Sequence, residues 1–488
     1  MPSHPIHQGI PYNYKTLPSV HHVRVLQLRP GVDNDPLQCS LLTTSVKEAP
    51  PYSALSYVWG GPATERAPVI CDGKEISVTI NLIEALHRLR LPKETRTVWA
   101  DAVCINQKDF LERAQQVSIM PLIYEHAQQV LIWAGTPAGG TDMNAFNLIR
   151  EVNDYVRKQL IYKRHYEEIR VIKPDGLFDP DDKRWKVLAA MFQMPWFERL
   201  WVLQEVGLAA SATLYYGALA VRWSDIVNFA DVVSRDANRW RLGETRPRTT
   251  LIFEANKFMW LTYENKKSWR SEIPYVYESI NYWNKQLGAK LNFFTTFATA
   301  TRFNATEPRD HLYAILGHPT ARELERSPYR VPIDYEMPID KLRLEFARAV
   351  VSIDSNLEFL TLVQNGYETP EKNPPSWAPH LGVRKNIRIA EDAQLYGYCA
   401  GSMKQVKAST TAGGQLMLTG VLIDTITWCS EGLRWINFQE VTDPENLLLV
   451  TLEALLDPKF PSPYSFSERI DLTGEVLTCD PRPSSQEQ

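Results

Sequence analysis

The sequence predicts an α/β fold with a parallel sheet and crossover helices, and two observations lead to this prediction. Between residues 52 and 135, short apolar stretches alternate with amphipathic ones in the order strand, helix, strand, helix, strand. The hydrophobic content of 44% and the charged content of 23% are typical of a globular protein. A chain of 488 residues is too long for one ordinary core, so we expect further domains.

The first half of the predicted sheet follows a Pro-rich lead-in, residues 1–50, which holds one strand candidate, VRVLQL (23–28). The apolar stretch YSALSYVW (52–59) predicts a buried strand. APVICDGKEISVT (67–79) predicts a hairpin, because Asp72-Gly73 is a favoured two-residue turn. NLIEALHRLRLP (81–92) predicts a helix that ends at Pro92 and has these apolar residues on one face: Leu82, Ile83, Leu86 and Leu89.

The second half of the sheet begins with TVWADAVCIN (97–106), which is apolar and β-branched enough to predict a buried strand. Helical spacing follows over 109–127, and Pro121 is expected to kink or break that helix. QQVLIWAG (128–135) predicts the next strand, ended by Gly135. The apolar face of the helix is expected to contain Phe110, Ala114, Val117 and Tyr124.

The remaining chain predicts less regular architecture. Residues 184–209 are helical in pattern on both sides of Pro195 and close an α/β domain over 51–217. For residues 218–320 the sequence pattern predicts a mostly helical region. For 321–475 it predicts a smaller mixed α+β region. The tail, 476–488, is polar and Pro-rich and is predicted to be disordered.

Charge and composition argue against several classes of protein. With 53 basic and 57 acidic residues the net charge is -4, which gives no bulk attraction to nucleic acid. The densest basic stretch, 234–248, is interpreted as a solvated loop. A binding patch for an anionic partner is the alternative. The six cysteines form no CxxC pair and the ten histidines no HxxxH or HExxH motif, so no metal site is predicted.

The same sequence features predict a cytoplasmic protein. The N-terminus lacks the apolar core of a signal peptide, and no run of about 18 apolar residues predicts a membrane span. Scattered cysteines fit a reducing compartment. Cys104 with His87 or His126 has no protease signature around it, so we interpret this cysteine as buried and inert.

Three motifs stand in the order and approximate spacing of the fungal heterokaryon incompatibility (HET) domain: YSALSYVWG (52–60), the stretch 97–135, and WFERLWVLQEV (196–206). EPRDHLYAILG (307–317), VPIDY (331–335) and PPSWAP (374–379) resemble segments that commonly follow that domain. The resemblance implies a fungal protein whose HET domain triggers growth arrest and cell death on recognition of non-self. It also implies an incompatibility partner protein of unknown identity, with self-association as a further option. After about residue 380 the chain departs from this pattern.

HET domains in turn resemble Toll/interleukin receptor (TIR) domains, which have a flavodoxin-like fold and of which some hydrolyse NAD. The first strand of TIR domains often ends in a Ser-Tyr pair beside the nucleotide pocket, as Ser56 and Tyr57 do here. A catalytic glutamate follows a tryptophan by four residues, as Glu205 follows Trp201. The resemblance therefore implies NAD as a substrate, with no cofactor, and Glu205 as the carboxylate that stabilises an oxocarbenium-like state.

Each candidate residue has an alternative structural role. Glu205 is either catalytic or an ion-paired or surface helix residue. If it is catalytic, Glu205→Ala is expected to abolish toxicity and to leave folding intact, because an exposed carboxylate contributes little stability; a docking module is expected to keep killing. Asp101 is costly inside an apolar strand and is either a pocket residue opposite Glu205 or a partner of Arg113 or of a helix N-terminus. Arg113, like Arg199, binds either a phosphate or a carboxylate of the protein.

Ser56 and Tyr57 point to opposite sides of a strand, so one of them is expected to line the crevice, where Gly60 permits close approach of the backbone. Packing alone is the alternative for this pair. The tryptophans are expected mainly in the core, although they are also able to wall a nucleotide site. Three functions stay open: an NAD-hydrolysing enzyme, a death-inducing interaction module, and a paralogue without a present role in incompatibility.

Overall fold

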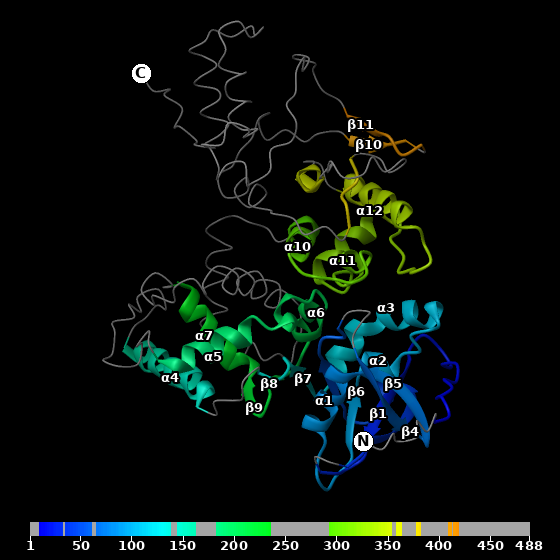
Figure 1. Ribbon diagram of the computed structural model, residues 1–488. Helices are drawn as coiled ribbons and strands as arrows, with labels where there is room; N and C mark the ends of the chain where they lie inside the picture. Colours follow the sequence, from blue (N-terminus) through cyan, green and yellow to red (C-terminus); the bar gives the residue numbers. More distant parts are fainter. Residues whose placement is uncertain are drawn as a thin grey trace, which may run out of the picture.

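A computed structural model describes residues 9–32, 35–60, 65–137, 144–162, 182–235, 292–353, 358–363, 377–381, 408–411 and 413–418. The first half of the chain forms a sheet with helices packed around it, and the later helices gather on the side of α3 and α6 (Figure 1). The predictions for 236–248 and for the tail, 476–488, lie outside the described residues.

The sheet has nine strands in the order β5-β4-β2-β1-β6-β3-β7-β8-β9. Its parallel centre is β6-β3-β7-β8, and antiparallel hairpins, β4-β5 and β8-β9, form the two ends. The α/β class is thus confirmed. The strands are β1 His22–Leu28, β2 Gln38–Ser45, β3 Ser53–Ser56, β4 Arg66–Cys71, β5 Lys74–Thr79, β6 Arg96–Trp99, β7 Gln129–Trp133, β8 Ala212–Tyr216 and β9 Leu219–Arg222.

In chain order the four central strands are arranged 2-1-3-4, because β6 and β7 lie on opposite sides of β3. This is the beginning of the doubly wound order 2-1-3-4-5, in which ligands bind outside the carboxyl ends of the strands, where the order reverses. Here the reversal occurs at β3, which ends at Ser56.

The helices of the first half are α1 Ile80–Leu89, α2 Asp101–Cys104, α3 Phe110–His126, α4 Ala145–Tyr162, α5 Lys183–Phe192, η3 Pro195–Glu198, α6 Val202–Gly207 and α7 Trp223–Arg235, with η1 at Val46–Glu48. The later elements are α10 Phe293–Ala300, α11 Asp310–Tyr313, η6 Pro319–Arg326, α12 Ile339–Ile353, η7 Glu358–Leu362, β10 Ala408–Thr410 and β11 Leu416–Leu418. Among the helices of the described ranges, none combines the length and hydrophobicity that crossing a bilayer requires.

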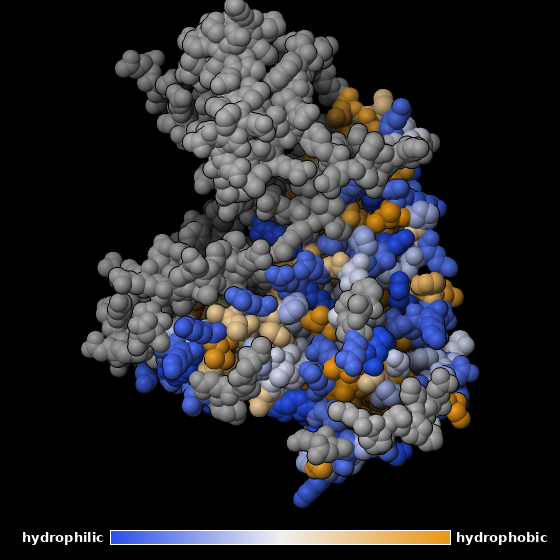
Figure 2. Space-filling view, in the orientation of Figure 1, coloured by the Kyte–Doolittle hydropathy of each residue, from blue (hydrophilic) through white to orange (hydrophobic). Residues whose placement is uncertain are grey.

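Local sequence explains several of these elements. Asp72 has φ 51° and Gly73 has φ 75°, so both central residues of the predicted hairpin turn are left-handed, as a type I′ turn requires. Helix α1 buries Leu82, Leu86 and Leu89, as predicted. On the face shown in Figure 2, hydrophilic residues predominate and smaller hydrophobic areas lie between them.

Helix α3 corrects two expectations. It runs without a break through Pro121, because buried side chains before it (Val117) and after it (Tyr124) fix both halves against the core. Its buried face agrees with the predicted one in part, since Val117 and Tyr124 are buried but Ala114 is half-buried. Phe110 is 50% exposed, since it lies in the first turn, beyond the edge of the core.

The predicted strand over 97–106 is wrong beyond Trp99, where β6 ends. Asp101 begins the one-turn helix α2, in which its carboxylate accepts a hydrogen bond from the Ala102 amide at 2.8 Å. An aspartate favours such a turn because its side chain binds nearby backbone N–H groups. Asp101 therefore follows the strand and does not lie inside it.

The sheet extends beyond residues 51–217 at both ends, since it includes β1, β2 and β9. Strand β1 lies between β2 and β6, and its Arg24 is 2% exposed. The Arg24 guanidinium donates to both carboxylate oxygens of Glu112 in α3, at 2.7 and 3.0 Å. The segment before the family motifs is thus part of the same core.

Candidate functional site

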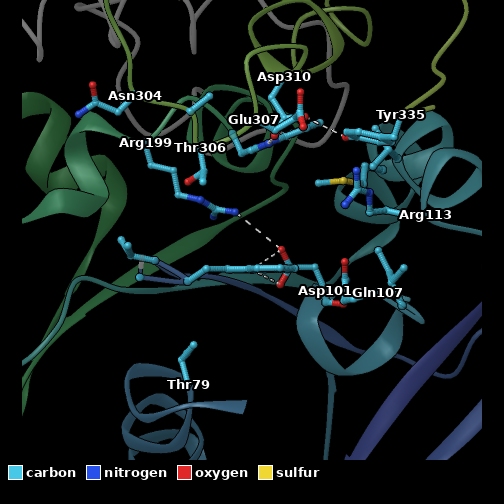
Figure 3. A pocket seen from close by; sticks show the side chains of 18 of the residues that line it. Thr79, Asp101, Gln107, Arg113, Arg199, Asn304, Thr306, Glu307, Asp310 and Tyr335 are labelled. Carbon is cyan, nitrogen blue, oxygen red and sulfur yellow. Dashed lines mark hydrogen bonds and ion pairs between the residues drawn. The ribbon is translucent and has the colours of Figure 1, made fainter. Parts of the chain in front are cut away.

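A cavity of about 850 Å³ lies at the carboxyl ends of β3 and β6, next to the point where the strand order reverses (Figure 3). Its floor includes Trp59 and Gly60, which follow β3, and Asp101, which follows β6. Ligand pockets of proteins typically have volumes of about 300–1,000 Å³. The remaining lining residues are Val58, Arg66, Thr79, Ile105, Gln107, Arg113, Val117, Met120, Pro195, Arg199, Trp201, Asn304, Ala305, Thr306, Glu307, Asp310 and Tyr335.

Glu205 lies beneath this cavity and does not line it. The residue is 0% exposed, in contrast to an exposed position on a helix. Its Oε2 accepts a hydrogen bond from the Ser56 hydroxyl, and its Oε1 accepts one from Arg199 Nη1 at 2.9 Å. Trp196 Nε1 in turn donates to the Ser56 hydroxyl at 2.8 Å. Burial raises the pKa of Glu205 to about 7, although Arg199 and Ser56 favour the ionised form.

Arg199 separates Glu205 from the cavity. Its Nη1 also donates to the Tyr57 carbonyl oxygen at 2.7 Å, and its Nη2 lies 3.7 Å from Asp101 Oδ2. One guanidinium therefore links the two candidate carboxylates. Figure 3 shows Arg199 reaching down towards Asp101 at the cavity floor.

Asp101 is the predicted carboxylate that reaches the cavity. Trp59 Nε1 lies 2.9 Å from both of its carboxylate oxygens, which fixes the plane of the carboxylate. Burial raises the pKa of Asp101, and the charge of Arg199 and the hydrogen bond from Trp59 oppose this shift. The predicted alternative, an ion pair with Arg113, is wrong because Arg199 takes that place.

The sequence match agrees with this arrangement. Residues 52–205 match the model of the family described as Heterokaryon incompatibility protein (HET). This chain carries a HET domain. The matched segment begins just before β3 and ends at Glu205, so it contains both partners of the Ser56–Glu205 hydrogen bond.

Over an alignment of 461 residues, the chain is 24% identical to a Neurospora crassa protein, "Heterokaryon incompatibility protein 6, OR allele". The alignment covers 85% of this chain and 65% of that relative, so the chain spans about 65% of the relative's length. No solved structure matches the chain.

Residues beyond the HET domain cover the cavity. Asp310 accepts hydrogen bonds from Trp201 Nε1 and from the Tyr335 hydroxyl, both at 2.9 Å. The Asn304 amide donates to the Glu198 carbonyl oxygen at 2.7 Å, and the Leu200 amide donates to the Asn304 carbonyl oxygen at 3.0 Å. Burial raises the pKa of Asp310 to about 6. We call residues 304–310 together with Tyr335 the cover segment.

Of the predicted site residues, Gly60, Asp101, Arg113 and Trp201 line the cavity, whereas Ser56, Tyr57 and Glu205 lie beneath it. The hydroxyl of Tyr57 is buried, and burial followed by the charge of Asp101 raises its pKa. Sequence analysis missed the site role of the cover segment. Its signal was present, since Glu307 and Asp310 belong to EPRDHLYAILG and Tyr335 to VPIDY.

Other candidates have structural positions. Cys104 is 0% exposed, and burial raises its pKa to about 12, so a thiolate is disfavoured. Trp99, Trp133 and Trp196 lie in the core, while Trp59 and Trp201 reach the cavity. Within the described residues, no group of three or more His, Cys, Asp or Glu side chains is placed to hold a metal ion.

Proposed function

We propose that this HET-domain chain acts in fungal heterokaryon incompatibility, in which recognition of non-self leads to the death of the fused cell. The family match over residues 52–205 and the name of the Neurospora crassa relative support this role. The proposal places the chain in the cytoplasm, together with an incompatibility partner protein and with self-association as a further option.

At the molecular level, we propose that the HET domain hydrolyses NAD or a related nucleotide in the cavity. The observation that carries this proposal is the position of the cavity, at the carboxyl ends of β3 and β6 and next to the reversal of strand order between β3 and β7. Doubly wound sheets bind nucleotides outside the carboxyl ends of their strands, at that reversal. A buried carboxylate, Glu205, lies directly behind the same strand end.

The chemistry requires one carboxylate near the ribose. The bond between C1′ and the nicotinamide nitrogen breaks, its electron pair goes to the ring nitrogen, and water adds to C1′ while losing a proton. A negative charge stabilises the oxocarbenium-like state of this reaction. Asp101 already lines the cavity. Glu205 acts on the ribose only when Arg199 turns away, because Arg199 binds Glu205 on the cavity side.

A second candidate function is a non-enzymatic interaction module that causes death by docking. The observation that favours it is the complete burial of Glu205, whose two carboxylate oxygens both accept hydrogen bonds from the protein. Buried and fully hydrogen-bonded carboxylates commonly serve the fold.

The deciding experiment measures NAD turnover by the purified full chain and by its Asp101→Asn and Glu205→Gln variants, with thermal unfolding of each as the control for folding. Hydrolysis by the wild type that is lost in a folded variant supports the enzyme and identifies the carboxylate. A folded wild type that kills fungal cells on expression but leaves NAD intact, even at concentrations that allow self-association, supports the docking module.

A further inference from the structure

The Arg113 guanidinium stacks on two aromatic rings at the cavity, but its hydrogen-bond donors are not used by the described part of the protein. Its side chain makes no hydrogen bond or ion pair to a described residue, and its Nε is buried without a hydrogen-bond partner. By contrast, Arg199 binds Glu205 and the Tyr57 carbonyl oxygen, and Arg66 binds Ser77. Arg113 is therefore the cavity arginine whose donors are free for a ligand.

The position of the Arg113 guanidinium is fixed by stacking. Its Cζ lies 3.7 Å from the centroid of the Tyr335 ring and 5.3 Å from that of Phe110. Tyr335 is itself held by its hydrogen bond to Asp310. Figure 3 shows Arg113 on one wall of the cavity, with Tyr335 above it and Gln107 below. A stacked guanidinium keeps its edge available, and that edge presents parallel N–H groups suited to two oxygens of a phosphate.

The carboxylates of the cavity make no hydrogen bond or ion pair with this edge, although the charge of Arg113 acts on Asp310 and opposes the rise of its pKa by burial. Asp310 already accepts hydrogen bonds from Trp201 and Tyr335, and Asp101 accepts them from Trp59. Glu307 is paired with Arg309 at 2.5 Å. An anionic ligand that enters the cavity can therefore accept hydrogen bonds from the guanidinium of Arg113.

We infer that Arg113 binds a phosphate of the cavity's ligand, and that this ligand is a nucleoside diphosphate or its ribosyl ester. The inference deepens the proposed function and rests on it for the identity of the cavity as a nucleotide site. Because Arg113 comes from the HET domain and Tyr335 from the cover segment, the phosphate subsite is complete only when both are in place.

The test uses ADP-ribose, which contains the diphosphate but has no nicotinamide bond to break. Binding to the full chain is measured by calorimetry for the wild type, Arg113→Met and Arg113→Lys. We expect affinity to fall about 10- to 100-fold in Arg113→Met, because hydrogen bonds to a charged group are lost. The lysine variant keeps the charge but loses the planar fork, so its affinity should lie between the other two.

Three controls make the result specific. Arg157→Met removes an exposed arginine in α4 and should leave binding unchanged. Adenosine, which lacks phosphate, should bind the wild type and Arg113→Met equally. Tyr335→Leu removes the stacking ring and should weaken ADP-ribose binding several-fold. Should Arg113→Met fail to fold, Arg113→Lys carries the comparison, because it keeps both charge and stem.

The inference is overturned if the wild type and a folded Arg113 variant bind ADP-ribose equally, or if the wild type binds neither ADP-ribose nor inorganic pyrophosphate. NAD hydrolysis with the same KM in wild type and Arg113→Met also overturns it, while the proposed function stands. Arg113-dependent binding without NAD hydrolysis has the opposite meaning: the phosphate subsite stands, and the hydrolytic part of the proposed function fails.

Discussion

The Ser56 hydroxyl donates a hydrogen bond to the carboxylate of Glu205, which lies 149 residues later in the chain. This contact joins the end of the central strand β3 to helix α6. Both side chains are 0% exposed, so the bond lies in the core below the cavity. Ser56 and Glu205, which the resemblance to TIR domains identified as site candidates, therefore connect β3 to α6 in the folded domain.

Replacement of Glu205 by alanine should destabilise the protein by about 3–5 kcal/mol, because it leaves the Arg199 charge buried with only a longer ion pair to Asp101. This corrects the expectation that Glu205→Ala leaves folding intact, which assumed an exposed side chain. Urea denaturation of wild type and variant measures the loss. Glu205→Gln keeps the shape and should cost less. Equal midpoints for wild type and Glu205→Ala would contradict the burial.

Stability should depend on pH through Glu205. The pKa of this carboxyl rises from 4.5 to about 7 in the folded protein, so between these values the native state holds a proton that the unfolded chain has released. The free energy of unfolding therefore falls as pH rises from about 5 to 7, by on the order of 3 kcal/mol for this group. Urea midpoints at pH 5, 6, 7 and 8 should show a weaker decrease in Glu205→Gln than in the wild type.

Asp310 should link the cover segment to the HET domain in a pH-dependent way. Trp201→Phe removes the indole donor to Asp310, and we expect a loss of about 1–3 kcal/mol at pH 7.5. The loss should be smaller at pH 5, because the pKa of Asp310 is about 6 and its protonated form accepts a weaker hydrogen bond. Thermal unfolding at the two pH values checks this difference. An equal loss at both would show that the indole acts through packing alone.

The N-terminal strand should be indispensable to the HET domain. Glu112→Ala leaves Arg24, which is 2% exposed, as an unpaired buried charge, and should cost about 3–5 kcal/mol. A double variant, Arg24→Met with Glu112→Leu, should recover much of this loss. Circular dichroism melting of the three proteins provides the comparison. A fragment limited to residues 52–205 should not fold, and a cooperative melt of that fragment would count against the shared core.

Strands β1, β3 and β7, the β4-β5 hairpin and helix α1 were predicted because their signals are local, whereas β2, β8 and β9 were missed. Alternation of apolar residues and the Asp72-Gly73 turn depend on neighbours in the chain. The end of β6 was missed because the stretch stays apolar past Trp99, while the Asp101 side chain binds the backbone and starts a turn. Pro121 remained inside α3 because tertiary packing outweighs the lost backbone bond.

The site was predictable in part. The family resemblance indicated Ser56 and Glu205. It did not indicate that Glu205 is buried below the cavity, with Arg199 bound to its carboxylate on the cavity side. The sequence did not determine the partner of Asp101, since two arginines, Arg113 and Arg199, and a helix N-terminus were available. Only the folded arrangement shows that Arg199 takes the carboxylates and leaves Arg113 to the cavity.

The late position of β8 has a consequence during synthesis. Strand β7 ends at Trp133, but its parallel neighbour β8 begins only at Ala212, so a nascent chain carries β7 as an open edge while the intervening residues are translated. Glu205 and Trp201 also emerge from the ribosome in this late portion. A truncated translation product that stops before them has the Ser56 strand but neither the carboxylate nor the cavity wall, and is an aggregation-prone fragment without the site.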